Sequence, residues 1–361
     1  MTGSISQEES AVTGADVRAK TRRGVYFLAN DAILDVTIAF LKSFRIHNPA
    51  VPLCLIPFGD DIERLAALGE IYDFSIYSDR CMLERCDEIS LKFFDWRCGQ
   101  FRKLCAFEGE FDEFIYVDCD TIVLNDVYFT FQFLDRADFI TSHSDEPHLR
   151  QWVWKESIYE AGVLSAQQIA FSANTGYFCS RKGQFTISGL ERDLQKSLDV
   201  KQHLELGCAE QAYLNHIVVT SGCRYASLKK MKLDSGHWSI PLERWAGDKG
   251  RLRSWLGGLR ASARAKILLI HWAGMWSAQP SDRAIYAALE RFGFPSRTPT
   301  VRFFLRHKWL WKYYRHYPYR RAIAGAVRID AAPTRTPERS VGEVLPHLSA
   351  AMIGEIREKR I

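Results

Sequence analysis

Short apolar runs alternate with segments of helical periodicity along this chain, and this alternation restricts the fold more than any other feature. Residues 24–29 (GVYFLA) form an uninterrupted apolar run, which is typical of a strand buried on both faces. Residues 32–48 follow with apolar side chains at helical spacing and stop at Asn48-Pro49. Strands that alternate with helices at such intervals predict a mostly parallel sheet with helices on both faces.

The same alternation continues further along the chain. Strands are predicted at 51–57, 73–77, 113–117 and 265–271, with residues 171–179 as one more candidate, and helices at 60–68, 101–107 and 209–219. The fold class is therefore α/β. Because no repeat or low-complexity linker interrupts the pattern, we expect a flexible N-terminal segment (1–22), one domain (23–300) and a C-terminal extension (301–361).

Two carboxylates follow the strand predicted at residues 113–117. Asp118 and Asp120 are separated by one residue, so on extended backbone their side chains point the same way while Cys119 points oppositely. Like charges on one face repel unless a cation lies between them, and open α/β sheets bind ligands at the carboxyl ends of their strands. The pair predicts a divalent metal site, although two solvated carboxylates at the start of a loop would give the same pattern.

A phosphatase of the haloacid-dehalogenase type would also place Asp-x-Asp after a strand. In that class the usual run is Asp-x-Asp-Gly-Thr near the start of the chain. Here Thr121 follows Asp120 directly, and three predicted strands come first. Both differences argue against a phosphatase.

Further motifs stand in a fixed order around the carboxylate pair. They are Asn30-Asp31 after the first strand, Lys103 in FRKL, Asn174 in FSANTG, Glu210-Gln211 in EQAYLN, and His271 and Gly274 in IHWAG. In this order, over about residues 24–280, they resemble the retaining glycosyltransferases of the glycogenin and bacterial lipopolysaccharide-galactosyltransferase type (family 8-like). The resemblance implies a GT-A fold, which is a Rossmann-like, mostly parallel sheet flanked by helices, here with a C-terminal helical extension rich in basic and aromatic residues.

The resemblance also implies a ligand set for the metal. Asp118, Asp120 and His271 would supply two carboxylate oxygens and one imidazole nitrogen. This set suits Mn²⁺, and Mg²⁺ less well because of the nitrogen. By itself, a histidine at the end of a strand is more often a structural residue than a ligand.

For the donor, the resemblance implies that Asn30 and Asp31 contact uridine and that Lys103 lies near the phosphates or the donor sugar. Asn174 would line the same site, and Gly274 would let the backbone approach phosphate. The chain departs from the family by two residues inserted before Asn174. It also lacks the Lys-Pro-Trp that follows the family's glycine, so the usual phosphate-binding lysine has no counterpart.

The function implied is transfer of a sugar from a nucleotide diphosphate donor, uridine-linked, to a glycan or lipid-linked acceptor with retention. Gln211 would line the attacked face of the sugar, and Glu210 would orient it. A sugar-phosphate nucleotidyltransferase is the enzyme alternative, but the segment Leu28–Asp31 is not the Gly-rich, basic loop that class requires. A catalytically inactive scaffold protein that binds nucleotide sugars remains open.

The cysteines and the distribution of charge predict where the protein is located and which surface it contacts. The chain has nine cysteines without a C-x-x-C pair, and its first 22 residues contain no apolar signal core, so we expect a reduced cytoplasmic location. Residues 301–361 hold 13 Lys/Arg against 5 Asp/Glu, and residues 301–319 interleave eight aromatic with five basic side chains. This extension predicts peripheral contact with an anionic membrane on its inner face. Packing on the domain is the alternative, and nucleic acid is the least favoured partner.

Overall fold

A computed structural model describes residues 21–236, 239–245 and 267–273. Its main sheet has seven strands in the order β3-β2-β1-β4-β7-β6-β8, and β7 runs antiparallel to both of its neighbours. The remaining neighbours are paired in parallel, so the predicted mostly parallel sheet is confirmed. The bounds of the strands are β1 Arg23–Ala29, β2 Leu53–Pro57, β3 Ser75–Ile76, β4 Glu113–Val117, β6 Phe139–Thr141, β7 Tyr177–Arg181 and β8 Tyr225–Ser227.

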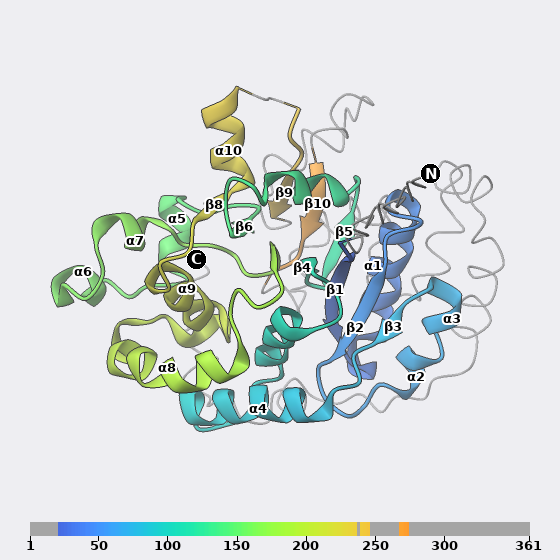
Figure 1. Cartoon of the computed structure of the whole chain (residues 1–361), viewed down its shortest axis with the longest axis horizontal. Helices are drawn as coiled ribbons and strands as arrows, with labels where there is room; N and C mark the ends of the chain where they lie inside the picture. The colour runs from blue at the N-terminus through green and yellow to red at the C-terminus, as the bar shows by residue number, and fades with distance from the viewer. Residues whose placement is uncertain (1–20, 237–238, 246–266, 274–361) are drawn as a thin grey trace, which may run out of the picture.

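A second, three-stranded sheet lies beside the carboxyl end of β4 (Figure 1). It consists of β5 (Thr121–Val123), β10 (Ile267–His271) and β9 (Leu242–Trp245), with β10 in the middle. β10 is antiparallel to β5 and parallel to β9. The chain passes directly from β4 to β5, so the three residues between them connect the two sheets.

Helices cover both faces of the main sheet. The longer ones are α1 (Leu34–His47), α4 (Arg80–Phe94), α8 (Ile187–Val200), α9 (Gln211–Thr220) and α10 (Leu228–Ser235). Single turns are α2 (Glu63–Ala66), α3 (Gly69–Tyr72), α5 (Pro147–Arg150), α6 (Ser157–Ala161) and α7 (Ala166–Ala170). The 3₁₀ segments are η1 (Asp31–Ile33), η2 (Gly99–Glu108), η3 (Tyr128–Phe133), η4 (Lys201–His203) and η5 (Leu206–Cys208).

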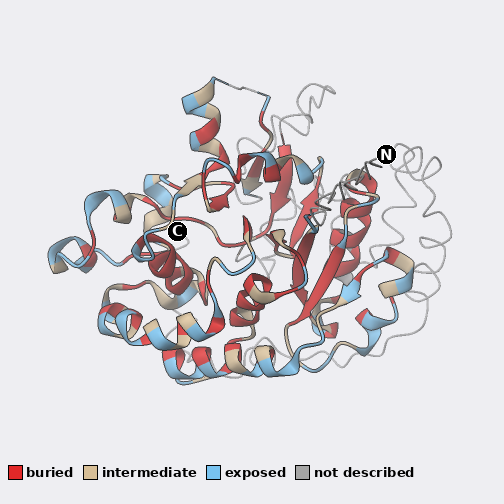
Figure 2. Cartoon of the chain, in the orientation of Figure 1, coloured by how far each residue is buried: buried red, intermediate tan, exposed pale blue. Residues whose placement is uncertain are grey.

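Strand β1 shows how the sequence builds two cores. Tyr26 and Leu28 pack with α4, α8 and α9 on one face, whereas Val25, Phe27 and Ala29 pack with α1 on the other. Side chains alternate along a strand, so an apolar residue at every position is what a sheet covered on both faces requires. Figure 2 shows the result, with buried strands at the centre and exposed residues along the outer sides of the helices.

The predicted strands at 24–29, 51–57 and 113–117 are confirmed, as is the helix at 209–219. Three predictions need correction. Residues 101–107 form the 3₁₀ segment η2, and the helix expected at 60–68 is only the single turn α2, since α3 begins beyond that range at Gly69. β7 begins only at Tyr177. In the last case residues 171–176 lie outside the sheet, where both backbone groups of Ala173 bond to the Asn215 side chain on α9.

The proposed domain limits stay predictions, because residues 1–20 and 274–361 lie outside the described part of the chain. The C-terminal extension and its predicted membrane contact fall in that range. Among the residues described, no helix is long and apolar enough to cross a membrane.

Acid should weaken the packing of α9 on α8. His216 is buried, its Nδ1 lies 2.9 Å from Ser197 Oγ, and burial lowers the pKa of His216 to about 4. An unfolded histidine has a pKa near 6.5, so the unfolded chain binds the proton more tightly. The stabilisation is therefore complete above about pH 6.5, and roughly 2 to 3 kcal/mol is lost as the pH falls to about 4.5.

Urea unfolding of the wild type and of His216→Gln, measured between pH 7.5 and 4.5, checks this. We expect the variant to lose less stability than the wild type over that range. Parallel curves would show that His216 does not carry the effect.

Candidate metal centre

The tripeptide Asp118-Cys119-Asp120 lies in the bend that connects β4 to β5, and it is fixed from both sides. The Asp118 N–H donates to Gly176 O at 2.7 Å, at the entrance to β7. The Trp272 N–H donates to Asp120 O at 3.0 Å, just beyond β10. Both carboxylates are thus anchored by the backbone of segments that are distant in sequence.

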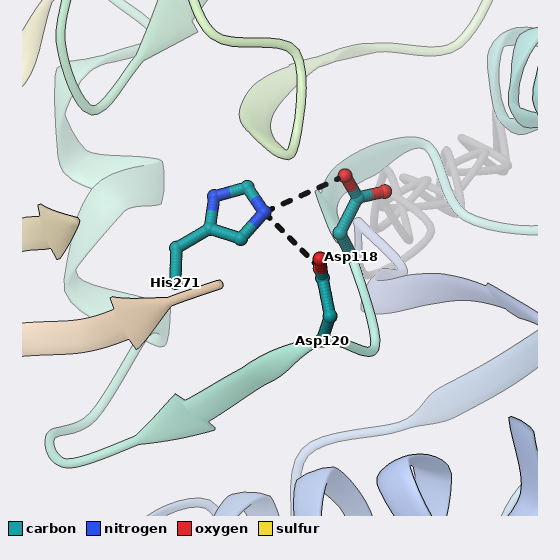
Figure 3. Close-up of side chains that lie close together, drawn as sticks. All are labelled: Asp118, Asp120 and His271. Atoms are coloured by element: carbon teal, nitrogen blue, oxygen red, sulfur yellow. Dashed lines mark ion pairs between the residues drawn. The ribbon is translucent and has the colours of Figure 1, made fainter. Parts of the chain in front are cut away.

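Within this bend, the side chain of Cys119 and those of the two aspartates lie on different sides. Cys119 is buried in the apolar core beside α1, and burial raises the pKa of its thiol well above the usual value. Asp118 and Asp120 point together toward the other side (Figure 3).

His271 joins the two carboxylates because β10 pairs with β5. In that pairing His271 lies opposite Thr121, the residue that follows Asp120. The His271 Nε2 atom is 3.1 Å from Asp120 Oδ1 and 3.8 Å from Asp118 Oδ2 (Figure 3). One ligand atom from each of the three residues lies within 4.8 Å of the others. The structure therefore brings together the three residues that the sequence suggested.

Two observations test whether these residues fit a cation. Among the residues that the structure describes, no group forms a well-aligned hydrogen bond with the buried His271 Nε2 atom, although Asp120 Oδ1 lies 3.1 Å away. A buried polar atom without a partner is costly, and a metal ion would satisfy it. Burial opposes protonation of His271, but Asp120 and Glu243 outweigh it and raise the pKa of the imidazole well above its usual value. The site thus favours positive charge, and its two oxygens and one nitrogen fit a divalent cation such as Mn²⁺.

Gly176 provides the space for this group. A Cβ at this position would lie 2.7 Å from Asp118 Oδ2 and 3.0 Å from His271 Nε2. These separations are shorter than van der Waals contact, so any larger residue would displace the ligands. The side chain of the neighbouring Asn174 accepts the Gly176 N–H at 2.8 Å and holds this segment against the site.

The buried ion pair between Lys103 and Glu210 lies next to Asp118 and holds its carboxylate in place. Lys103, on η2, lies 2.6 Å from Glu210 Oε1 and 3.4 Å from Asp118 Oδ1. Burial lowers the pKa of Lys103, but Asp118 and Glu210 together raise it, so the ammonium stays charged. Burial raises the pKa of Glu210, while Lys103 opposes this change. The Tyr116 hydroxyl also donates to Asp118 Oδ1 at 2.7 Å, which leaves Oδ2 turned toward His271.

Glu210 and Gln211 are positioned by a turn that precedes α9. Ala209 has φ 52° and ψ −127°, and Glu210 follows with φ −71° and ψ −9°, the pattern of a type II′ turn. Glycine is the usual residue at the first of these positions, so Ala209 is strained. The turn directs Glu210 to Lys103 and to the Thr175 hydroxyl, which donates at 2.7 Å. Gln211 Nε2 donates to Trp152 O at 3.0 Å.

The residues expected to contact the nucleotide lie at the carboxyl end of β1, the neighbour of β4. The Asp31 carboxylate accepts the N–H groups of Arg64 and Leu65, each at 2.8 Å, and so caps α2. Asn30 is half-buried and immediately precedes η1. Their contact with a nucleotide stays a prediction. Gly274 lies outside the described residues.

The sequence did not indicate every residue of the site. Tyr116 could have been found, because it precedes Asp118 by two positions and therefore shares its face of the strand. Glu243 could not: its carboxylate lies 2.7 Å from His271 Nδ1, but it belongs to the short strand β9, for which the sequence has no apolar pattern.

The solved structures that resemble this chain do so only distantly. No protein-family profile and no curated protein matches this chain. Among solved structures, the glycosyltransferase GlyE of Streptococcus pneumoniae is 14% identical, with a TM-score of 0.41 over 86% of this chain and 64% of its own. The galactosyltransferase LgtC, in complex with donor and acceptor sugar analogues, is 12% identical, with a TM-score of 0.47 over 74% of this chain and 94% of its own. Mouse xyloside xylosyltransferase 1 is 10% identical, with a TM-score of 0.44 over 69% of this chain and 96% of its own.

This chain thus spans less than two thirds of the length of GlyE. At these identities and TM-scores the likeness carries no conclusion about activity, so the chemistry has to be argued from the site.

Gly176→Ala should disrupt the metal site without unfolding the protein. The added methyl group would displace Asp118 and His271, so we expect Mn²⁺ affinity, measured by isothermal titration calorimetry, to fall by roughly tenfold or more. Gly59→Ala is the matched control, because a Cβ there would meet nothing within 4 Å. Equal affinity of the two variants would contradict the assignment of the cluster.

The Lys103–Glu210 pair should behave as a buried ion pair in a double-mutant series. Lys103→Met leaves the Glu210 carboxylate buried and unpaired, which should cost about 3 to 5 kcal/mol in urea unfolding. Adding Glu210→Leu removes that charge, so we expect the double variant to recover most of the loss. A double variant that is no more stable than the single one would exclude this explanation.

Proposed function

We propose that the protein is a metal-dependent glycosyltransferase that uses a nucleotide diphosphate sugar, uridine-linked, and acts with retention on a glycan or lipid-linked acceptor. The observation that carries this proposal is the group of Asp118, Asp120 and His271, whose buried Nε2 atom makes no hydrogen bond within the described part of the chain. The group lies at the carboxyl end of β4, where open α/β sheets bind their ligands. The order of the motifs around it supports the same conclusion.

Asp118, Asp120 and His271 would hold the cation, Mn²⁺ or Mg²⁺. When bound, such an ion neutralises the negative charge that develops on a departing diphosphate. The residues themselves provide a rigid, partly buried cradle, in which the bend between β4 and β5 fixes the two carboxylates and β10 fixes the imidazole.

Lys103 supports the proposal in a different way from the one the sequence suggested. Its ammonium lies 2.6 Å from Glu210, and 3.4 Å from both Asp118 and the Thr175 carbonyl. These three acceptors match the three N–H groups of a lysine. We therefore propose that Lys103 holds Asp118 and Glu210 in place, and that direct contact with phosphate falls to other groups.

The surroundings of Glu210 favour front-face attack over double displacement. A covalent route needs a carboxylate that is free to reach the anomeric carbon. Glu210 is buried and bound to both Lys103 and Thr175, and its neighbour Gln211 is an amide. We propose that Gln211 lines the sugar and that the leaving phosphate takes the proton of the acceptor.

Asn30, Asp31 and Asn174 are proposed to complete the donor site. Asn174 lies nearest the metal group, with Nδ2 3.3 Å from His271 Nδ1. Gly274 and the membrane contact of residues 301–321 are proposed on sequence grounds alone.

A donor panel tests the proposal. The protein is incubated with UDP-, GDP- and CMP-linked sugars and Mn²⁺, and release of the free nucleotide is followed. We expect release from a UDP-sugar, lost with a chelator and reduced roughly 100-fold or more in Asp120→Asn. Asp95→Asn, at a side chain that is 91% exposed, is the matched control.

Three results would overturn the proposal. Full activity of Asp120→Asn with chelator present would exclude the metal. Formation of a nucleotide sugar from sugar phosphate and nucleoside triphosphate, with release of pyrophosphate, would indicate a nucleotidyltransferase. Binding of donors without any turnover would indicate a scaffold protein.

A further inference from the structure

We propose that Glu243 is a positioning residue of the metal centre, which fixes the tautomer of His271 so that Nε2 presents its lone pair to the cation. This inference rests on the metal site of the proposed function and assigns a role to a residue that no motif of the sequence indicated.

The contact between the two side chains defines the tautomer. Glu243 Oε1 lies 2.7 Å from His271 Nδ1, and an ionised carboxylate can only accept a hydrogen bond. The proton of a neutral imidazole must then be on Nδ1, which leaves Nε2 as a ligand atom. Asn174 Nδ2 lies farther from the same nitrogen, at 3.3 Å, and is 3.5 Å from Glu243 Oε1.

The placement of Glu243 indicates that His271 is its main partner. β9 pairs in parallel with β10, and the Glu243 N–H donates to Ser142 Oγ at 2.9 Å, which anchors the backbone beneath the site. The side chain is buried, and its second oxygen, Oε2, has no hydrogen-bond partner among the residues described. A carboxylate whose purpose was stability would be satisfied by N–H groups or an arginine, so this arrangement is better explained by its contact with the imidazole.

Loss of Glu243 should weaken metal binding, because the imidazole of His271 would no longer be held by a hydrogen bond at Nδ1. Without an acceptor at Nδ1, the ring can rotate or place its proton on Nε2, and either change blocks coordination. Loss of such a partner typically costs 10- to 100-fold in metal affinity.

The experiment measures Mn²⁺ affinity of the full chain by isothermal titration calorimetry for wild type, Glu243→Gln and Glu243→Ala. Glutamine keeps an acceptor oxygen but removes the charge, whereas alanine removes both. We expect a loss of roughly 10- to 100-fold in Glu243→Ala and a clearly smaller loss in Glu243→Gln. Glu113→Gln is the control, because it removes a carboxylate at the opposite end of β4, where Glu113 pairs with Arg23.

A second readout reports the tautomer directly. In protein labelled with ¹⁵N-histidine and loaded with diamagnetic Mg²⁺, the resonance assigned by its absence in His271→Gln should show a protonated Nδ1 in wild type and Glu243→Gln. In Glu243→Ala this signature should be lost.

The possible outcomes distinguish failure of the metal site from failure of the role assigned to Glu243. Wild type that binds no Mn²⁺ overturns the metal site and this inference with it. Wild type that binds, with equal losses in Glu243→Gln and Glu243→Ala, would show that charge matters and positioning does not. Unchanged affinity in Glu243→Ala would leave the metal site standing and remove the role of Glu243.

Discussion

The pairing of β10 with β5 is the interaction on which the site depends. The register His271 opposite Thr121 places an imidazole from late in the chain beside carboxylates from its middle. A slip of one residue would turn the imidazole to the other side of the small sheet. The backbone bonds at Asp118 and Asp120 act in the same direction, because they prevent the bend from moving relative to β7 and β10.

Much of the main sheet could be predicted from sequence. Apart from Arg23 and Glu113 at their starts, β1, β2 and β4 are apolar throughout because helices cover both faces, and this signal requires no knowledge of distant contacts. The three residues of the candidate metal centre could also be predicted from the sequence. Asp118 and Asp120 follow the clearest strand, and His271 ends another, so each lies where a sheet presents side chains to a ligand. The order of the motifs along the chain then indicated that the three side chains lie close together.

The rest depended on tertiary contacts that no local pattern encodes. Residues 99–108 form a 3₁₀ segment that carries Lys103, and the side chain of Lys103 contacts two carboxylates inside the protein. Residues 171–176 begin with Phe171 and continue the pattern toward β7, yet Asn174 and Gly176 lie against the candidate metal centre and the segment is outside the sheet. Glu243 lies on a four-residue strand whose identity depends entirely on its neighbour β10.

Cys119 connects the metal group to the interior. Its side chain is buried beside α1, while the residues on either side of it carry the two carboxylates. The packing of the thiol holds the backbone from which both carboxylates project. A change of volume at Cys119 would therefore reach the two carboxylates through the main chain, although the thiol itself points away from them.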